Sequence, residues 1–162
     1  CYCPEPGRIC VTTEKKADAD GYICGHVHDE NAYSIGGVSG NAGLFSTLDD
    51  CIRFGSMLSR RAEGYLRKET FDLAVTDHTE GISDSARGLG FHMFREEVYP
   101  GGANMSRGSY GHSGFTGTYL YVDRESGVFC ILLSNRVHFG RDTAPFFEQK
   151  QKFFDTVFAQ IK

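Results

Sequence analysis

The sequence predicts an α/β protein of the α+β kind, with an antiparallel sheet and a C-terminal helix packed on it. One observation is a pair of apolar runs, at 119–122 and 128–133, separated by the polar, Gly-containing segment 123–127. Two such runs around a short turn predict a β-hairpin. The other observation is the segment 145–161, in which apolar residues recur at three- and four-residue steps. That spacing predicts an amphipathic helix, whose apolar side must be covered by another element.

The composition is that of a folded domain without a strong charge. Among 162 residues, 17 Lys and Arg oppose 21 Asp and Glu, hydrophobic residues make up 40% and charged residues 23%. This balance excludes disorder for most of the chain and predicts one domain. A mildly acidic chain without a basic block argues against nucleic acid or an anionic membrane as a main partner. The longest apolar run, Val128–Leu133, is far shorter than the roughly 20 residues of a membrane-spanning helix.

Residues 1–24 are predicted to form a loop-rich lead-in, because they show no sustained period and contain two prolines. The main domain is predicted to comprise residues 25–162, and it begins with a Gly-rich stretch that ends near residue 45. The chain starts at Cys1 rather than at Met, and no secretory signal is visible. We therefore expect a processed product, an excised domain or a fragment.

Six cysteines divide into four in the lead-in and two in apolar-periodic segments: Cys1, Cys3, Cys10 and Cys24, then Cys51 and Cys130. The last two are expected to be buried thiols. For the first four, both free thiols and one disulfide remain open. Cys24 with His26 and His28 also suggests a zinc-stabilised small domain, although Cys-x-Cys and His-x-His spacings differ from the usual ligand spacing. The main prediction is that the chain uses no metal and no cofactor.

Two helices are predicted before the hairpin. Ser46 offers a hydroxyl cap to the first helix, whose apolar residues recur at helical spacing and which Gly64 ends. Acidic residues in its first turn and Arg60-Arg61 in its last turn complement the helix dipole. A second, weaker helix is predicted for residues 68–77.

Loops and strands account for the following segments. Residues 78–88 and 99–109 are predicted to be loops, and residues 89–94 a short strand. The apolar run 128–133 predicts burial on both faces of the sheet, as in a central strand. The C-terminal helix is predicted to begin near Pro145, since proline is tolerated in a first turn.

The stretch most relevant to chemistry is Tyr-Gly-His-Ser-Gly-Phe-Thr-Gly-Thr at 110–118, which leads into the hairpin. It places an imidazole, a hydroxyl and glycines at the start of a strand. Gly114 and Gly117 leave the backbone uncovered, so that a ligand can approach the strand edge. Edge N–H groups can hold an acyl group or stabilise a developing oxyanion. The pattern alone is compatible with a site and also with a strand bulge.

Several segments resemble the C-terminal part of the penicillin-recognising serine hydrolases, which include class C β-lactamases, D-alanyl-D-alanine carboxypeptidases and related esterases. The resemblance covers roughly residues 8–162 and is carried by Val-His-Asp-Glu-Asn-Ala (27–32), Gly-Gly-Val-Ser-Gly-Asn-Ala-Gly-Leu-Phe-Ser-Thr (36–47), Gly-Leu-Gly-Phe (88–91), Gly-His-Ser-Gly-Phe-Thr-Gly-Thr (111–118), Tyr-Leu-Tyr-Val-Asp (119–123) and Ile-Leu-Leu-Ser-Asn-Arg (131–136). It implies the serine β-lactamase-like fold and acyl transfer from an ester, amide or β-lactam to water through an acyl-serine intermediate.

The resemblance also implies roles for single residues. The family's Lys/His-Ser/Thr-Gly motif stands on the strand beside the active site, and His112-Ser113-Gly114 matches its His variant. His112 would be the cationic or proton-handling group, and Ser113 would bond a substrate carboxylate or ester. Gly114 would lie at the substrate, and the N–H of Phe115 would be one of two oxyanion donors. Arg136 is a candidate for contact with a substrate carboxylate, with a surface ion pair as the alternative.

Two family motifs are missing, because the sequence contains neither Ser-x-x-Lys nor Tyr-x-Asn. The family carries both in the N-terminal part of its fold. The resemblance therefore implies a C-terminal fragment without its nucleophile, which we expect to be inactive alone. The alternative is a non-catalytic ligand-binding or sensor module on the same fold.

The expected partners follow from the same resemblance. They are a small-molecule or peptide acyl substrate, the N-terminal part of the fold and, through the apolar face left uncovered, further copies of the chain. Relatives often work in the bacterial envelope, outside the cytoplasm, but the sequence leaves the compartment open. His28 with Asp29 could form a base and its orienting acid or pin a loop, and Asn41 stands where many relatives have His.

Overall fold

In the described residues, three helices precede four strands and a fourth helix follows them, an order that the sequence largely predicts. A computed structural model describes residues 1–15, 21–95, 101–142 and 144–161. Its elements are α1 (Glu30–Ser34), α2 (Leu48–Ser59), α3 (Lys68–Ala74), β1 (His92–Met93), β2 (Tyr110–Ser113), β3 (Thr118–Val122), β4 (Phe129–Leu133) and α4 (Ala144–Ala159). The strands form one antiparallel sheet in the order β1-β2-β3-β4. The predicted α+β fold is therefore confirmed.

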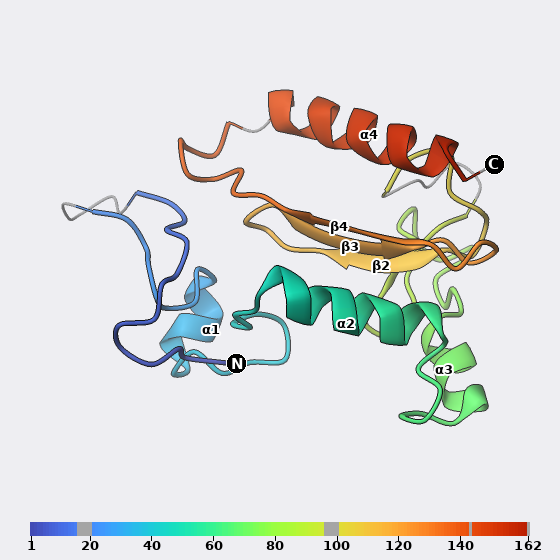
Figure 1. The fold of residues 1–162 in the computed structure, drawn as a ribbon, viewed down its shortest axis with the longest axis horizontal. Helices are drawn as coiled ribbons and strands as arrows, with labels where there is room; N and C mark the ends of the chain where they lie inside the picture. Colours follow the sequence, from blue (N-terminus) through green and yellow to red (C-terminus); the bar gives the residue numbers. More distant parts are fainter. Residues whose placement is uncertain (16–20, 96–100, 143, 162) are drawn as a thin grey trace.

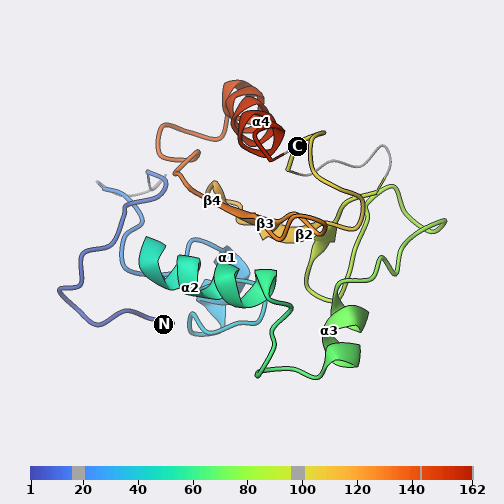
Figure 2. The ribbon, with the colours of Figure 1, turned by 45° about the vertical axis from the view of Figure 1, so that its right-hand side comes forward.

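The sheet is the middle of three layers, with α2 on one face and α4 on the other (Figures 1 and 2). On the α2 side, Leu58 and Phe71 are buried with Tyr110 of β2. On the α4 side, Phe154 is buried with Tyr121 of β3. The C-terminal helix thus covers the sheet with its apolar side, as its residue spacing predicts.

The hairpin of β3 and β4 is closed by a turn built on Asp123, a residue that is 5% exposed. Its carboxylate accepts hydrogen bonds from the N–H of Ser106 at 2.6 Å and from the N–H and hydroxyl of Ser126 at 2.9 and 2.8 Å. Burial by itself would raise the pKa of Asp123, but these hydrogen bonds outweigh it and lower the pKa to about 2. The predicted turn therefore depends on a buried, ionised carboxylate.

The position of β4 confirms one part of a prediction and differs from another. The apolar run 128–133 predicts burial on both faces, as in a central strand, and β4 is covered on both faces but is the outermost strand of the sheet in the described part of the chain. Both of its faces are covered, because Phe129 packs on Gly55 of α2 and Cys130 is buried on the α4 side. The apolar residues on both faces of β4 are thus explained by the helices that cover the two faces of the sheet, and they do not indicate how many strands pair with β4. Among the described residues, the outer edge of β4 has no pairing strand.

Helix α2 has different ends from those predicted. Thr47 caps it rather than Ser46, since the Thr47 hydroxyl accepts a hydrogen bond from the N–H of Asp50 at 3.2 Å. The helix stops before the predicted Gly64, because Arg61 adopts a left-handed backbone conformation with φ of 58°.

Helix α3 and strand β1 are both shorter than predicted. α3 ends at Ala74 rather than at residue 77, and the predicted strand 89–94 is limited to β1. The N–H of Leu89 donates to the carbonyl of Ala74 at 2.9 Å, and Gly90 follows with φ of 82°. Because the chain turns at Leu89 and Gly90, pairing with β2 begins only after Gly90. Residues 99 and 100 of the predicted loop 99–109 lie outside the described residues.

The described part of the lead-in is mostly irregular, as predicted, yet it contacts the segment after β4. The N–H of Thr13 donates to Ile23 at 2.8 Å, and Ile23 donates back to Glu14 at 2.9 Å. The Asn135 side chain donates to the Thr12 carbonyl. The lead-in is thereby attached to the end of the hairpin, while the domain boundary after residue 24 stays a prediction.

All six cysteines are free thiols in the structure. Cys130 is buried, as expected, whereas Cys51 is partly exposed. None of the helices in the described ranges is long and apolar enough to cross a membrane.

Candidate active site

The edge of β2 is open where the sequence predicts a site. β1 pairs with β2 only through His92 opposite Gly111 and Met93 opposite Tyr110. The N–H of Gly114 donates to β3, at 2.6 Å from the Thr118 carbonyl. Because successive residues of a strand direct their N–H groups to opposite sides, the backbone of the residue before Gly114 faces away from β3. Past the end of β1, that side is an accessible strand edge.

The tight packing of the turn after β2 explains why glycines occupy positions 114 and 117. A Cβ on Gly114 would lie 2.3 Å from the Thr118 hydroxyl oxygen, and a Cβ on Gly117 would lie 2.7 Å from that of Ser134. Gly117 also has φ of 107°, which favours glycine. The turn 114–118 therefore requires these glycines whether or not a ligand approaches, and contact of Gly114 with substrate stays a prediction.

Phe115 lies at the tip of this turn, and the residue is 55% exposed. Its carbonyl accepts a hydrogen bond from Nε of Arg136, whose guanidinium carbon lies 4.4 Å from the centre of the Phe115 ring. Across the described residues, the N–H of Phe115 has no hydrogen-bond acceptor. A backbone donor without an acceptor, beside an open strand edge, is what an oxyanion site requires.

His112 is exposed on β2 and stands beside a second histidine. Its Nδ1 lies 2.8 Å from the Ser113 carbonyl oxygen, and its ring centre lies 4.1 Å from that of His92 on β1. Burial, together with the nearby His112 and Arg87, lowers the pKa of His92 to about 4. A largely neutral imidazole therefore lies against the imidazole predicted to handle charge.

The low pKa of His92 predicts a loss of stability on mild acidification. In the unfolded chain an imidazole takes up a proton near pH 6.5, whereas folded His92 does so near 4. The free energy of unfolding should therefore fall as the pH drops from 6.5 toward 4. Urea unfolding at pH 7, 6 and 5 should show a smaller loss for His92→Gln than for the wild-type protein. A His78→Gln control should keep the wild-type loss, and equal losses in both variants would contradict the assignment.

Comparison with known proteins identifies the family. The family model described as Beta-lactamase matches residues 6–150. The chain belongs to the beta-lactamase family. The Escherichia coli K12 protein named "Putative D-alanyl-D-alanine carboxypeptidase" is 35% identical over 72% of this chain and 28% of its own length. The Salmonella gallinarum protein of the same name is 40% identical over 72% of this chain and 28% of its length.

Two further relatives extend the comparison. The Bacillus subtilis N-acetylmuramyl-L-alanine amidase is 36% identical over 70% of this chain and 27% of its own length. A solved beta-lactamase structure from Mycobacterium bovis superposes with a TM-score of 0.58 at 22% identity, covering 72% of this chain and 46% of that one. The similarity to this structure supports the beta-lactamase fold. This family member spans only a little over a quarter of the curated relatives it matches.

The other histidines of this beta-lactamase-family chain do not form a metal site. Throughout the described ranges, no three His, Cys, Asp or Glu side chains gather so that they could hold a metal ion. The sulfur of Cys24 lies 3.5 Å from the Cys10 carbonyl, and the His26 ring contacts that of Tyr33. The zinc-stabilised alternative is therefore not supported.

His28 also has partners that differ from those suggested by its sequence neighbours. Asp29 caps α1 by accepting from the N–H of Ala32 at 2.8 Å. His28 instead places Nδ1 at 2.9 Å from the Thr13 hydroxyl and Nε2 at 3.6 Å from a Glu14 carboxylate oxygen. These contacts attach the lead-in to the domain, and they match the interpretation in which the histidine pins a loop.

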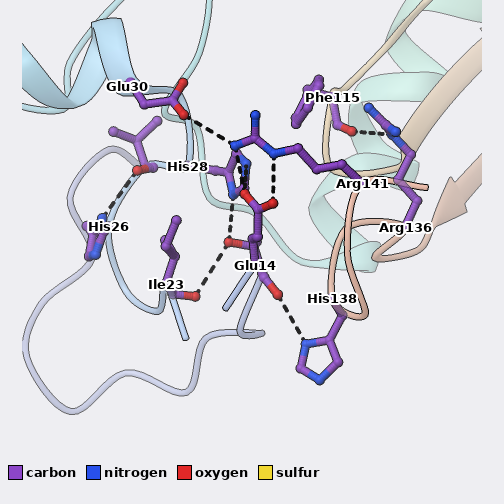
Figure 3. Close-up of polar contacts among 11 residues, drawn as sticks. Glu14, Ile23, His26, His28, Glu30, Phe115, Arg136, His138 and Arg141 are labelled. Atoms are coloured by element: carbon purple, nitrogen blue, oxygen red, sulfur yellow. Dashed lines mark hydrogen bonds and ion pairs between the residues drawn. The ribbon is translucent and has the colours of Figure 1, made fainter. Parts of the chain in front are cut away.

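Two groups near the site carry no local sequence signal. Glu14 binds Arg141 through two hydrogen bonds of 2.7 and 2.8 Å, although 127 positions separate them (Figure 3). The hydrogen bond from Arg141 lowers the pKa of Glu14 despite partial burial. His92 is likewise brought to His112 only by the pairing of β1 with β2. A single sequence does not reveal such pairs. Covariation among relatives would be needed to find them.

Proposed function

We propose that this chain is the C-terminal part of a serine acyl hydrolase, carrying one wall of the active site but not the nucleophile. The attacking serine and its lysine would come from sequence that this chain lacks, since it contains no Ser-x-x-Lys or Tyr-x-Asn. The chain alone would then have no useful hydrolase activity, because loss of the nucleophile leaves only residual catalysis in comparable hydrolases. The short coverage of the relatives supports this proposal.

One observation carries the proposal more than any other. The edge of β2 is open past the end of β1. In the turn that follows β2, the Phe115 N–H has no acceptor among the described residues. An acyl oxygen at that edge would accept a hydrogen bond from the Phe115 N–H. The second oxyanion donor would come from the N-terminal part of the fold. His112 would supply charge or move a proton, and Ser113 would bond the substrate's carboxylate or ester.

The remaining predicted contacts are part of the same proposal. Gly114 would pass directly beside the bound acyl group. Contact of Arg136 with a substrate carboxylate stays a prediction, because in the structure its Nε donates to the Phe115 carbonyl. The substrate would be an ester, amide or β-lactam. The names of the relatives, a D-alanyl-D-alanine carboxypeptidase and an amidase, favour an amide.

The uncovered surfaces support a missing part of the same fold. Helix α2 lies beside the edge of β4 that has no pairing strand among the described residues, and it exposes apolar side chains, with Leu48, Ile52 and Phe54 each about half exposed. Exposed apolar surface next to an unpaired strand favours association with further polypeptide. The N-terminal part of the fold would cover both features, and further copies of the chain could do so in its absence.

A fluorophosphonate probe tests the proposal, since it labels only an activated serine. We expect covalent labelling of the full-length gene product that contains this chain and no labelling of residues 1–162 alone. Mass spectrometry should place the label outside the present sequence. Labelling of residues 1–162 would contradict the missing nucleophile. A full-length product that binds acyl ligands but is never labelled would support the non-catalytic binding or sensor module instead.

A further inference from the structure

A cluster of cationic and aromatic side chains surrounds Phe115 and joins the lead-in to the end of the hairpin (Figure 3). Arg136 holds the Phe115 carbonyl and lies over its ring at 4.4 Å. The guanidinium carbon of Arg141 lies 5.7 Å from the centre of the same ring. The ring of His28 lies 5.5 Å from it, centre to centre. Phe115 is thus held through its carbonyl and its ring, while its N–H has no acceptor among the described residues.

Glu14 fixes the position of Arg141. Two parallel hydrogen bonds, at 2.7 and 2.8 Å, join the planar guanidinium of Arg141 to the two carboxylate oxygens of Glu14. A single hydrogen bond would leave the guanidinium free to rotate, whereas two hold its plane. Glu30 adds a third contact at 3.3 Å. The Glu14 side chain is 17% exposed, compared with 55% for Arg141, so the carboxylate is the less mobile partner. Nε2 of His28, whose side chain is 9% exposed, lies 3.6 Å from the Glu14 oxygen that Arg141 also binds.

The peptide plane that carries the Phe115 N–H is held from the other side of the turn. The Gly114 carbonyl belongs to this same plane, and it accepts a hydrogen bond from the Gly117 N–H at 3.0 Å. The Thr116 carbonyl accepts from the Arg136 N–H at 2.9 Å. Because the peptide plane between Gly114 and Phe115 and the Phe115 ring are both held, the direction of the Phe115 N–H is fixed.

We propose that Glu14 and Arg141 are positioning residues that orient the Phe115 N–H toward the acyl oxygen. This inference rests on the proposed hydrolase function and extends it to the lead-in, which would be part of the active-site support. Removing one oxyanion donor costs about 10² to 10³ in kcat in comparable enzymes, and a misdirected donor loses part of that. Loss of the pair should therefore lower kcat about tenfold without changing substrate binding.

The test uses Arg141→Gln and Glu14→Gln in the full-length gene product, with a chromogenic ester as substrate. We expect kcat to fall about tenfold in both variants and KM to stay within about twofold. Arg141→Lys should rescue little, because lysine keeps the charge but not the two-point fork. Arg107→Gln is the matched control, since it breaks an ion pair with Glu80 at 3.2 Å in which both side chains are 66% exposed.

A second readout is the Phe115 amide resonance in ¹⁵N-labelled protein. It should shift in Arg141→Gln and Glu14→Gln, but not in Arg107→Gln, with the melting temperature unchanged. An unshifted Phe115 amide, or an equal loss of kcat in the Arg107 control, would overturn the inference. If the wild-type product does not turn over the ester at all, the hydrolase proposal fails, and the amide resonance alone then decides whether the pair positions Phe115.

Discussion

Gly111→Ala is expected to destabilise the protein by roughly 3 kcal/mol, through a clash that the sheet cannot relieve. An added Cβ would lie 2.1 Å from the Leu120 carbonyl oxygen and 2.2 Å from the Tyr121 ring. The first of these atoms is backbone of β3, and the second belongs to a ring that is 1% exposed. Either β2 must move away from β3 or Tyr121 must leave the core. The first response displaces the strand that carries His112 and Ser113, and the second removes a buried ring from the core.

Urea unfolding followed by circular dichroism measures this effect, since the chain has no Trp for fluorescence. Gly40→Ala is the matched control, because a Cβ there meets nothing within 4 Å. It should change the free energy of unfolding by less than about 0.5 kcal/mol. A Gly111→Ala variant as stable as the Gly40 control would show that β2 and β3 are not packed as described.

Asp123→Asn is expected to cost about 3 kcal/mol, because it removes a buried, charged acceptor shared by several donors. The amide has one acceptor oxygen, whereas the carboxylate accepts from the Ser106 and Ser126 N–H groups on its two oxygens. An N–H of the new side chain would face a backbone N–H. The turn between β3 and β4 and its contact with the loop before β2 should both loosen.

The pH dependence gives an independent test of Asp123. Its pKa is about 2 in the folded protein and near 3.8 in an unfolded chain, so the folded state prefers the ionised form. This contribution is fully present above about pH 4 and is lost as the pH falls toward 2. Asp123→Asn should remove that part of the acid sensitivity, whereas Asp142→Asn, at an exposed position, should not. Identical acid unfolding curves for Asp123→Asn and the wild-type protein would be the contrary result.

The candidate site could be predicted from the sequence because its residues are local. His112, Ser113, Gly114 and Phe115 are consecutive, and a strand followed by a Gly-containing turn places them together without long-range contacts. His112 and Ser113 lie on β2 and the other two residues follow in the turn after it, while their roles in the site stay proposals.

Other features could not be predicted, because they depend on contacts between distant segments. The apolar run of β4 predicts burial on both faces, but it does not show that the helices α2 and α4 cover those faces or that β4 lies at the edge of the sheet in the described residues. The Glu14–Arg141 pair joins segments 127 residues apart, and neither residue differs locally from an ordinary surface charge. The lead-in is therefore linked to Phe115 only in the folded chain, through Arg141.

The hairpin, the C-terminal helix and the residue types on β2 follow from local sequence patterns, because residue period, turn composition and consecutive motif residues act over a few positions. Only the folded chain shows which edge of the sheet is open among the described residues, which histidine lies against His112 and which charges hold Phe115. Those outcomes depend on how strands pair and which loops meet, and many loop arrangements are compatible with the same local pattern.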